Sequence, residues 1–208
     1  MTATGEPMFS GVHPAILTPF GEDGGLRTDA LSESVEWLIE NGMDGIVGLG
    51  TLGESRSLAP DEHRVALATI IEAAAGRVPV TIGISGESAE EASRMAVAAT
   101  EAGAQALMCL PPLLYHAADS EIVAFFDQVA AASDLPLMVY NNPTGSRNDL
   151  SPGLIARLFD LETIVAVKEC SGDARRIAAT IGLTEGEMQV LVGGDDWALE
   201  GACAGAVG

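Results

Sequence analysis

Short apolar runs alternate with longer amphipathic segments along most of the chain. The apolar runs are continuous rather than alternating, which is typical of parallel strands that are covered on both faces. We expect strands at residues 12–17, 45–49, 78–84, 106–110, 137–141, 164–168 and 189–193. The segments between them have helical periodicity, and we expect helices at residues 29–41, 60–75, 89–102, 120–133, 151–158 and 174–181.

The order of these elements predicts an α/β fold. Seven strand–helix units that recur every 25–35 residues or so favour a (β/α)₈ TIM barrel over a doubly wound sheet. No linker-like or low-complexity segment interrupts them, so residues 1–208 are predicted to form a single, incomplete TIM-barrel domain. Residues 202–208 resemble the entrance to an eighth strand, which a barrel needs in order to close. We therefore expect a C-terminally shortened barrel with about seven βα units, the eighth cut off, and two unpaired sheet edges.

Composition narrows the class of protein and its partners. The net charge is −20, which argues against nucleic acid or an anionic membrane as a partner. No run approaches 20 apolar residues and no basic-then-apolar leader is present, so neither a transmembrane helix nor a secretory signal is predicted. The three cysteines, Cys109, Cys170 and Cys203, lack metal-ligand spacing and cannot all pair. A cytoplasmic protein with reduced cysteines and no metal is expected.

Lys168 is the one lysine among the 208 residues, and it follows the apolar run 163–167. Elsewhere the chain uses arginine, which stays protonated in proteins, whereas a desolvated lysine can lose its proton. A lysine at a strand end is often only a snorkelling or ion-paired side chain. The chemical interpretation is a nucleophile that forms a Schiff base with a carbonyl substrate.

Three further strand ends carry residues of chemical interest, and in a barrel these ends form the active site. Gly50 and Thr51 begin a turn whose backbone N–H groups could converge on an anion, although a tight turn with a helix cap is the ordinary alternative. Tyr140 could shuttle protons from its strand end, or it could be a core tyrosine with a satisfied hydroxyl. The run 193–196 places two glycines before Asp195 and its acidic neighbour, which could equally cap a helix.

Together these segments resemble the dihydrodipicolinate synthase and N-acetylneuraminate lyase superfamily of pyruvate-using Schiff-base lyases. The resemblance runs from about Val12 to the last residue, with the motifs in family order. It depends on a Gly-Thr-x-Gly-Glu turn at 50–54, Tyr-Asn-x-Pro at 140–143, Lys-x-x-Ser-Gly-Asp at 168–173, and Gly-Asp-Asp at 194–196. The resemblance implies a class I aldolase, an enzyme that makes or breaks a C–C bond to pyruvate through a lysine imine.

The resemblance also implies roles for individual residues. Lys168 would be the nucleophile, Tyr140 would relay protons, and Thr51 would supply a relay hydroxyl. The backbone N–H groups of Thr51 and Leu52 would hold the carboxylate of pyruvate or a related 2-oxo acid. No metal or organic cofactor is required, and a homo-oligomer, tetramer or dimer, is usual in the family. Further substrate-binding candidates are Gly50, Gly194, Asp195, Arg147 and Tyr115.

Departures from the family pattern bear on the substrate. Leu52 stands where the family's turn has a second hydroxyl, and Leu113 and Leu114 stand where lysine-biosynthetic members carry two tyrosines. Gly145 stands where those members carry a carboxylate-binding arginine, although the nearby Arg147 could reach an acidic group. These departures favour a catabolic paralogue over 4-hydroxy-tetrahydrodipicolinate synthase itself, which stays open as a second possibility. The same residues would also suit a 2-oxo acid dehydratase or deaminase of sugar-acid or hydroxyproline catabolism. A non-catalytic protein that binds a 2-oxo acid is the candidate from a different class.

Overall fold

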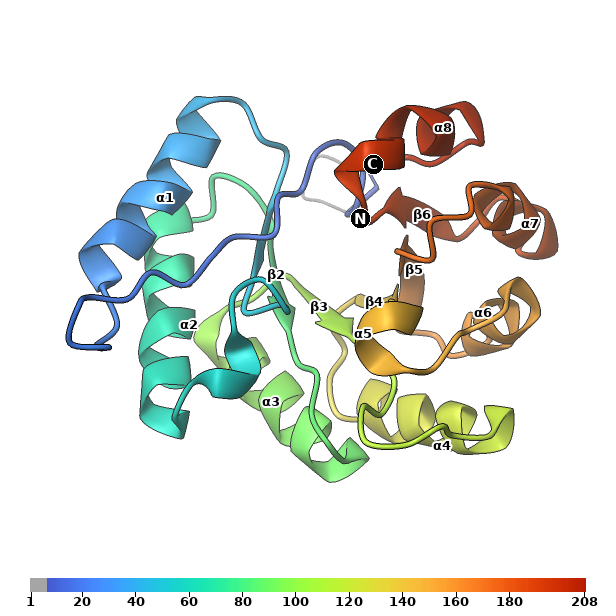
Figure 1. Cartoon of the computed structure of the whole chain (residues 1–208), viewed down its shortest axis with the longest axis horizontal. Coiled ribbons are helices and arrows are strands. Elements are labelled where there is room, and N and C mark those ends of the chain that lie inside the picture. The colour runs from blue at the N-terminus through green and yellow to red at the C-terminus, as the bar shows by residue number, and fades with distance from the viewer. Residues whose placement is uncertain (1–6) are drawn as a thin grey trace.

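A computed structural model describes residues 7–208, in which six strands form one parallel sheet (Figure 1). The strands are β1 (Ile46–Gly48), β2 (Val80–Gly83), β3 (Ala106–Cys109), β4 (Leu137–Asn141), β5 (Ile164–Glu169) and β6 (Gln189–Val192). They pair in sequence order, as barrel strands do. Six of the seven predicted strands are therefore confirmed, close to the boundaries expected from the apolar runs.

Helices lie on the outside of the ring of strands (Figure 1). The main ones are α1 (Thr28–Glu40), α2 (Pro60–Ala74), α3 (Ala89–Ala102), α4 (Asp119–Ala130), α6 (Pro152–Leu158) and α7 (Arg175–Leu183). Helical periodicity predicts all six. The short helices α5 (Pro143–Ser146) and α8 (Ala198–Cys203), and the 3₁₀ turns η1 (Ser55–Ser57) and η2 (Asp195–Trp197), were not predicted.

Local sequence signals explain where several helices begin and end. The Ser88 and Ser151 side chains accept hydrogen bonds from the backbone N–H of the third residue of α3 and of α6, which satisfies donors that have no partner inside the helix. Pro60 opens α2, a position at which its missing N–H costs nothing. Gly103 ends α3 at φ +95°, a left-handed conformation that glycine adopts without strain.

The predicted first strand, 12–17, is not a regular strand. It contacts β1 through a single bridge between Ala15 and Val47, with two hydrogen bonds: Val47 N–H to the Pro14 carbonyl and Ile16 N–H to the Val47 carbonyl. Pro14 has no N–H to donate, so it shortens the ladder that an apolar run alone predicts. The segment still lies where the strand before β1 belongs.

Residues 207–208 lie along the free side of β6. The Val207 N–H donates to the Val190 carbonyl, and the Val192 N–H donates to the Gly208 carbonyl. The Gly11 N–H in turn donates to the Val207 carbonyl, which joins the first segment to the last. The prediction of two unpaired sheet edges is therefore wrong, because short backbone segments pair with both outer strands. The fold is a TIM barrel in which six strands are regular.

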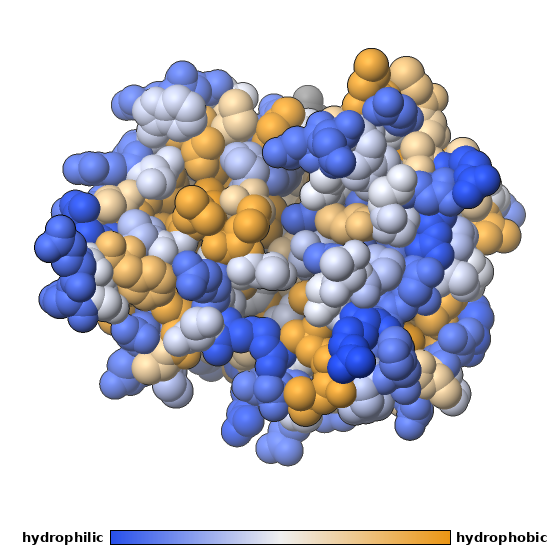
Figure 2. Space-filling model, viewed as in Figure 1, coloured by the Kyte–Doolittle hydropathy of each residue, from blue (hydrophilic) through white to orange (hydrophobic). Residues whose placement is uncertain are grey.

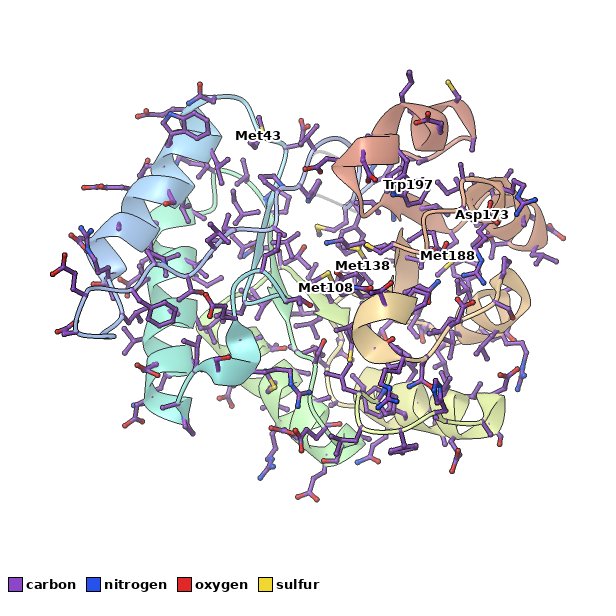
Figure 3. The ribbon with its side chains drawn as sticks, in the orientation of Figure 1. Met43, Met108, Met138, Asp173, Met188 and Trp197 are labelled. Atoms are coloured by element: carbon purple, nitrogen blue, oxygen red, sulfur yellow. The ribbon has the colours of Figure 1, made fainter. Side chains whose placement is uncertain are left out.

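Apolar side chains form two separate clusters, as a barrel requires. The larger one lies between the sheet and the helices, and includes Phe126 and Ile70. The smaller one fills the interior of the ring, where Met108 on β3 and Met138 on β4 point toward the centre (Figure 3). Tyr140 belongs to this interior cluster. The interior is thus a packed core, and an active site can form only above it.

Polar side chains cover most of the face in Figure 2, and apolar residues gather around its middle. Among the described residues, no helix has both the length and the apolar character needed to cross a membrane. The large apolar side chains that stay exposed include Leu17, Leu52 and Leu114.

Candidate active site

Tyr140 and Lys168 are direct neighbours across the β4–β5 pair. Successive side chains of a strand point to opposite faces, so both residues point into the barrel while Asn141 and Glu169, also paired, point outward. The Lys168 Nζ lies 4.6 Å from the centroid of the Tyr140 ring. The amine and the phenol therefore lie next to each other at the C-terminal end of the sheet.

A cavity of about 420 Å³ opens at this position. It is lined by Lys168 and Tyr140 together with the turn after β1 and the loop after β6. Of the residues singled out from the sequence, the cavity brings together Gly50, Thr51, Leu52, Tyr140, Lys168 and Gly194.

The remaining candidates lie elsewhere. Asp195 lines an adjoining cavity of about 610 Å³ that also reaches Lys168, while Asp196 lines the lysine cavity itself. Arg147 and Tyr115 are exposed and do not line either cavity. Arg147 has φ +62° at the end of α5, and this left-handed turn follows the short helix that sequence periodicity did not reveal.

Polar neighbours surround the Tyr140 phenol. Its oxygen accepts a hydrogen bond from the Asn142 Nδ2 at 3.1 Å, and the Thr51 hydroxyl and the Cys170 thiol are its other hydrogen-bonding neighbours. Burial, with a smaller contribution from Cys170, raises the pKa of Tyr140 to about 12. The phenol is therefore protonated at neutral pH and can donate a proton.

The amine of Lys168 lies in an environment that disfavours charge. Burial lowers its pKa below the ordinary value, and the neighbouring Cys170 and Asp195 oppose this effect only in part. A lowered pKa increases the fraction of neutral, nucleophilic amine near neutrality.

Cys170 and Gly193 are among the cavity residues that were not identified as site residues from the sequence. The sequence predicts a packing role for Cys170, yet its thiol lies beside both Tyr140 and Lys168, and burial raises its pKa. Gly193 lies against it: a Cβ at Gly193 would be 1.8 Å from the Cys170 Sγ and 3.0 Å from the Lys168 Cε. The only sequence signal was the glycine pair at 193–194, because the close approach depends on the register between β5 and β6.

A second cavity, of about 310 Å³, adjoins the first and shares Thr51 and Tyr140 with it. Arg56 lines it together with serine hydroxyls and apolar residues, and Gly145 also lines it. Arg56 is ion-paired with Glu87. The cationic side chain that borders the site here therefore comes from the turn after β1 rather than from Arg147.

A TIM barrel with a desolvated lysine at a strand end, beside a tyrosine and a glycine-rich turn, defines a class of Schiff-base lyases. Residues 8–208 match the model of the dihydrodipicolinate synthetase family. The chain belongs to that family, whose members are pyruvate-dependent lyases.

Curated relatives and solved structures agree with this assignment. The 4-hydroxy-tetrahydrodipicolinate synthase of Methanothrix thermoacetophila is 37% identical over 202 residues, which are 97% of this chain and 68% of the relative. The same-named enzyme of Roseobacter denitrificans is 38% identical over 170 residues, which are 82% of this chain and 58% of the relative. A structure of chloride-inhibited dihydrodipicolinate synthase from Acinetobacter baumannii, complexed with pyruvate, superimposes with a TM-score of 0.93 at 35% identity. That superposition covers 96% of this chain and 68% of the other.

The chain spans 58% to 69% of the length of eight curated relatives that it matches. All eight are named 4-hydroxy-tetrahydrodipicolinate synthase. These names describe the relatives and not this chain.

Proposed function

We propose that this protein is a class I aldolase that forms an imine between Lys168 and pyruvate or a related 2-oxo acid. The observation that carries the proposal is the position of the Lys168 amine, 4.6 Å from the ring of Tyr140 and in the same cavity as Thr51. The lowered pKa of Lys168 supports the same role, because only a neutral amine attacks a carbonyl.

The chemistry follows from these groups. The neutral amine of Lys168 adds to the ketone carbon of pyruvate, and uptake of one proton with loss of one water leaves a protonated imine. Loss of a proton from the adjacent methyl group then gives an enamine, which adds to an aldehyde carbon and forms the C–C bond. The aldehyde oxygen takes up a proton, for which the protonated phenol of Tyr140 is the donor. Water finally hydrolyses the imine, which releases a 4-hydroxy-2-oxo acid and restores the amine.

The turn after β1 is proposed to bind the carboxylate of the 2-oxo acid. Gly50, Thr51 and Leu52 line the cavity that contains the Lys168 amine. The backbone N–H groups of Thr51 and Leu52 are donors of the kind that hold carboxylates, and Leu52 supplies no hydroxyl of its own. We expect this turn to bind the carboxylate more weakly than a turn that carries two hydroxyl side chains.

A second candidate reaction is that of the curated relatives, 4-hydroxy-tetrahydrodipicolinate synthase, and their shared name favours it. The replacements at Leu113, Leu114 and Gly145 favour a different second substrate, and so a catabolic aldolase. A dehydratase or deaminase would use the same imine and would differ in expelling a leaving group from C4. We infer a cytoplasmic location from the free thiols, and a homotetramer or homodimer by analogy with the family.

Borohydride reduction in the presence of pyruvate tests the proposal. We expect a pyruvyl adduct on Lys168, found by mass spectrometry of the digested protein. Lys168→Arg is expected to abolish both adduct and turnover despite its retained charge, because a guanidinium forms no imine. An unmodified Lys168 in a protein that binds pyruvate reversibly would instead indicate a non-catalytic 2-oxo acid-binding protein. Product analysis with several aldehydes and 2-oxo acids would then separate C–C cleavage from loss of water or ammonia.

A further inference from the structure

Behind the reacting pair lies a second pair of residues that the reaction does not use. Asn141 follows Tyr140 on β4, and Glu169 follows Lys168 on β5. The two are register partners, with exposed fractions of 0% for Asn141 and 1% for Glu169. Neither lines the cavity that holds the amine. A carboxyl and an amide are therefore buried on the helix-facing side of the sheet, one residue beyond the catalytic positions.

The side chains are joined by a forked set of hydrogen bonds. The Asn141 Nδ2 donates to both Glu169 carboxylate oxygens, each at 3.0 Å. The Ser171 N–H donates to the Glu169 Oε1 at 2.7 Å, and the Leu150 N–H donates to the Asn141 Oδ1 at 3.0 Å. The amide orientation is fixed by this set, because its oxygen already accepts from Leu150 and its nitrogen faces two acceptors. The fork thus connects β4, β5 and the loops that follow both strands.

Backbone hydrogen bonds extend the connection across the site. The Cys170 N–H donates to the Asn141 carbonyl at 2.8 Å, and the Gly193 N–H donates to the Glu169 carbonyl at 2.8 Å. The peptide groups of Asn141 and Glu169 therefore hold the two residues that border the Lys168 amine. A displacement at this pair would move Cys170 and Gly193 together with the catalytic side chains.

A cation accompanies the buried carboxylate. The Arg176 Nη1 lies 4.0 Å from the Glu169 Oε2, and the same guanidinium is ion-paired with Asp149 at 2.6 Å. A buried charge is costly unless it is paired and hydrogen-bonded. The hydrogen bonds and Arg176 offset the cost of burying the Glu169 carboxylate. An apolar pair would fill the same space without that cost, which suggests that the fork has a use besides stability.

We propose that Asn141 and Glu169 are positioning residues that hold the Tyr140 phenol and the Lys168 amine at their working separation. Each is the next residue after a catalytic one, so the fork fixes the spacing and the rotation of the two strand ends. A misplacement of a catalytic group by about 1 Å can lower the rate by about 100-fold, so a fork that fixes the two strand ends would affect turnover. The consequence for turnover rests on the proposed function, whereas the placement of the amine does not.

Exchanging the two functional groups gives a sharp test. Glu169→Gln turns an amide nitrogen toward the Asn141 amide nitrogen, and Asn141→Asp sets two carboxylates against each other. In the double variant, the amide nitrogen introduced at position 169 can donate to the carboxylate introduced at position 141. The partners Leu150 and Ser171 keep their acceptors. We expect each single variant to lower kcat by about 10- to 100-fold, with the KM for pyruvate within about threefold, and the double variant to recover kcat to within about threefold.

A second readout needs no enzymatic activity. Since Lys168 is the one lysine of the chain, reductive methylation with formaldehyde and cyanoborohydride, followed by peptide mapping, reports on this amine alone. We expect the pH midpoint of its methylation to shift upward in each single variant, because a less rigid strand end admits water to the amine. The midpoint should return in the double variant. If wild-type protein forms no pyruvyl adduct, the proposed function fails, and the methylation midpoints still test the positioning.

Thr184→Val is the matched control, because it also deletes a buried hydrogen bond, from the Thr184 hydroxyl to the Thr180 carbonyl at 2.9 Å, but at the far end of α7. It is expected to lower thermal stability without changing kcat or the methylation midpoint. Single variants that behave like this control would overturn the proposal. A double variant that regains stability but neither turnover nor the midpoint would overturn it too, as would one that regains nothing, because the exchange keeps one hydrogen bond between the two side chains and the acceptors of the Leu150 and Ser171 N–H groups.

Discussion

Gly193 and Cys170 approach each other so closely that no side chain fits between them. A Cβ at position 193 would lie 1.8 Å from the Cys170 Sγ, well inside any allowed contact, and 3.1 Å from the Glu169 carbonyl oxygen. The thiol, the Lys168 amine and the loop after β6 are thereby packed against one another at the edge of the cavity. Substitutions at Gly193 should therefore lower the catalytic rate as well as the stability of the fold.

Gly193→Ala is predicted to lower kcat about tenfold or more and to destabilise the protein by about 1–3 kcal/mol, because the added methyl group displaces Cys170 and Lys168. Gly182→Ala, in α7 with nothing within 4 Å of the added Cβ, is the control and should be neutral or stabilising. Combining Gly193→Ala with Cys170→Ala should restore part of the activity. Steady-state kinetics and urea unfolding measure both effects, and an unaltered kcat in Gly193→Ala would contradict the prediction.

The pH dependence of imine trapping should follow two groups. Burial lowers the pKa of Lys168, so the neutral fraction, and with it the rate of adduct formation, rises with pH and levels off above that lowered pKa. The plateau should last until the pH approaches about 12, where Tyr140 ionises. Initial rates of pyruvyl adduct formation at a series of pH values give the profile. A rise that begins only near the ordinary pKa of lysine would show that the amine is not desolvated.

Arg56, and not Arg147, is predicted to affect the second substrate. Arg56→Ala should raise the KM of an anionic aldehyde several-fold, because Arg56 lines the cavity that shares Tyr140 and Thr51 with the lysine cavity. Arg147→Ala should change the same KM less than about twofold. The rate of pyruvyl adduct formation should be the same in both variants, which separates the second substrate from the first. The reverse ranking of the two arginines would refute this assignment.

Phe126 is predicted to be a major contributor to stability. Its side chain has no exposed surface, it packs edge-on against Phe125 with ring centroids 5.4 Å apart, and it lies between α4 and the sheet. Phe126→Ala should cost about 3–5 kcal/mol in the free energy of unfolding. Phe20→Ala, at a partly exposed position, should cost far less. Urea denaturation of the two variants compares them, and equal costs would contradict this account of the core.

Much of the fold could be predicted because its parallel strands are buried on both faces, and so appear in the sequence as continuous apolar runs. The exception was 12–17, where Pro14 has no N–H to donate and only one bridge to β1 forms. Residues 202–208 were predicted to lead into an eighth strand, and residues 207–208 do pair with β6, but the hydrogen bond that joins them to Gly11 could not be predicted, since two residues carry no periodicity.

In the candidate site, Lys168, Tyr140 and Thr51 were predicted from motifs, and parallel strands bring the residues at their C-terminal ends to one face of the barrel. Cys170 and Arg56 were missed as members of the site. The position of Cys170 depends on the register between β5 and β6, and that of Arg56 on the 3₁₀ turn η1, neither of which leaves a periodic signal in the sequence.

The hydrogen bond from Gly11 to Val207 has a consequence for how the molecule folds. Neighbouring strand–helix units can assemble from local contacts, whereas this link joins segments near opposite ends of the described chain and carries a large entropy of loop closure. The ring should consequently close late, after the helices have docked. Hydrogen exchange during refolding should therefore protect β3 and β4 before Val207, and a partly assembled, open sheet is the species most exposed to aggregation.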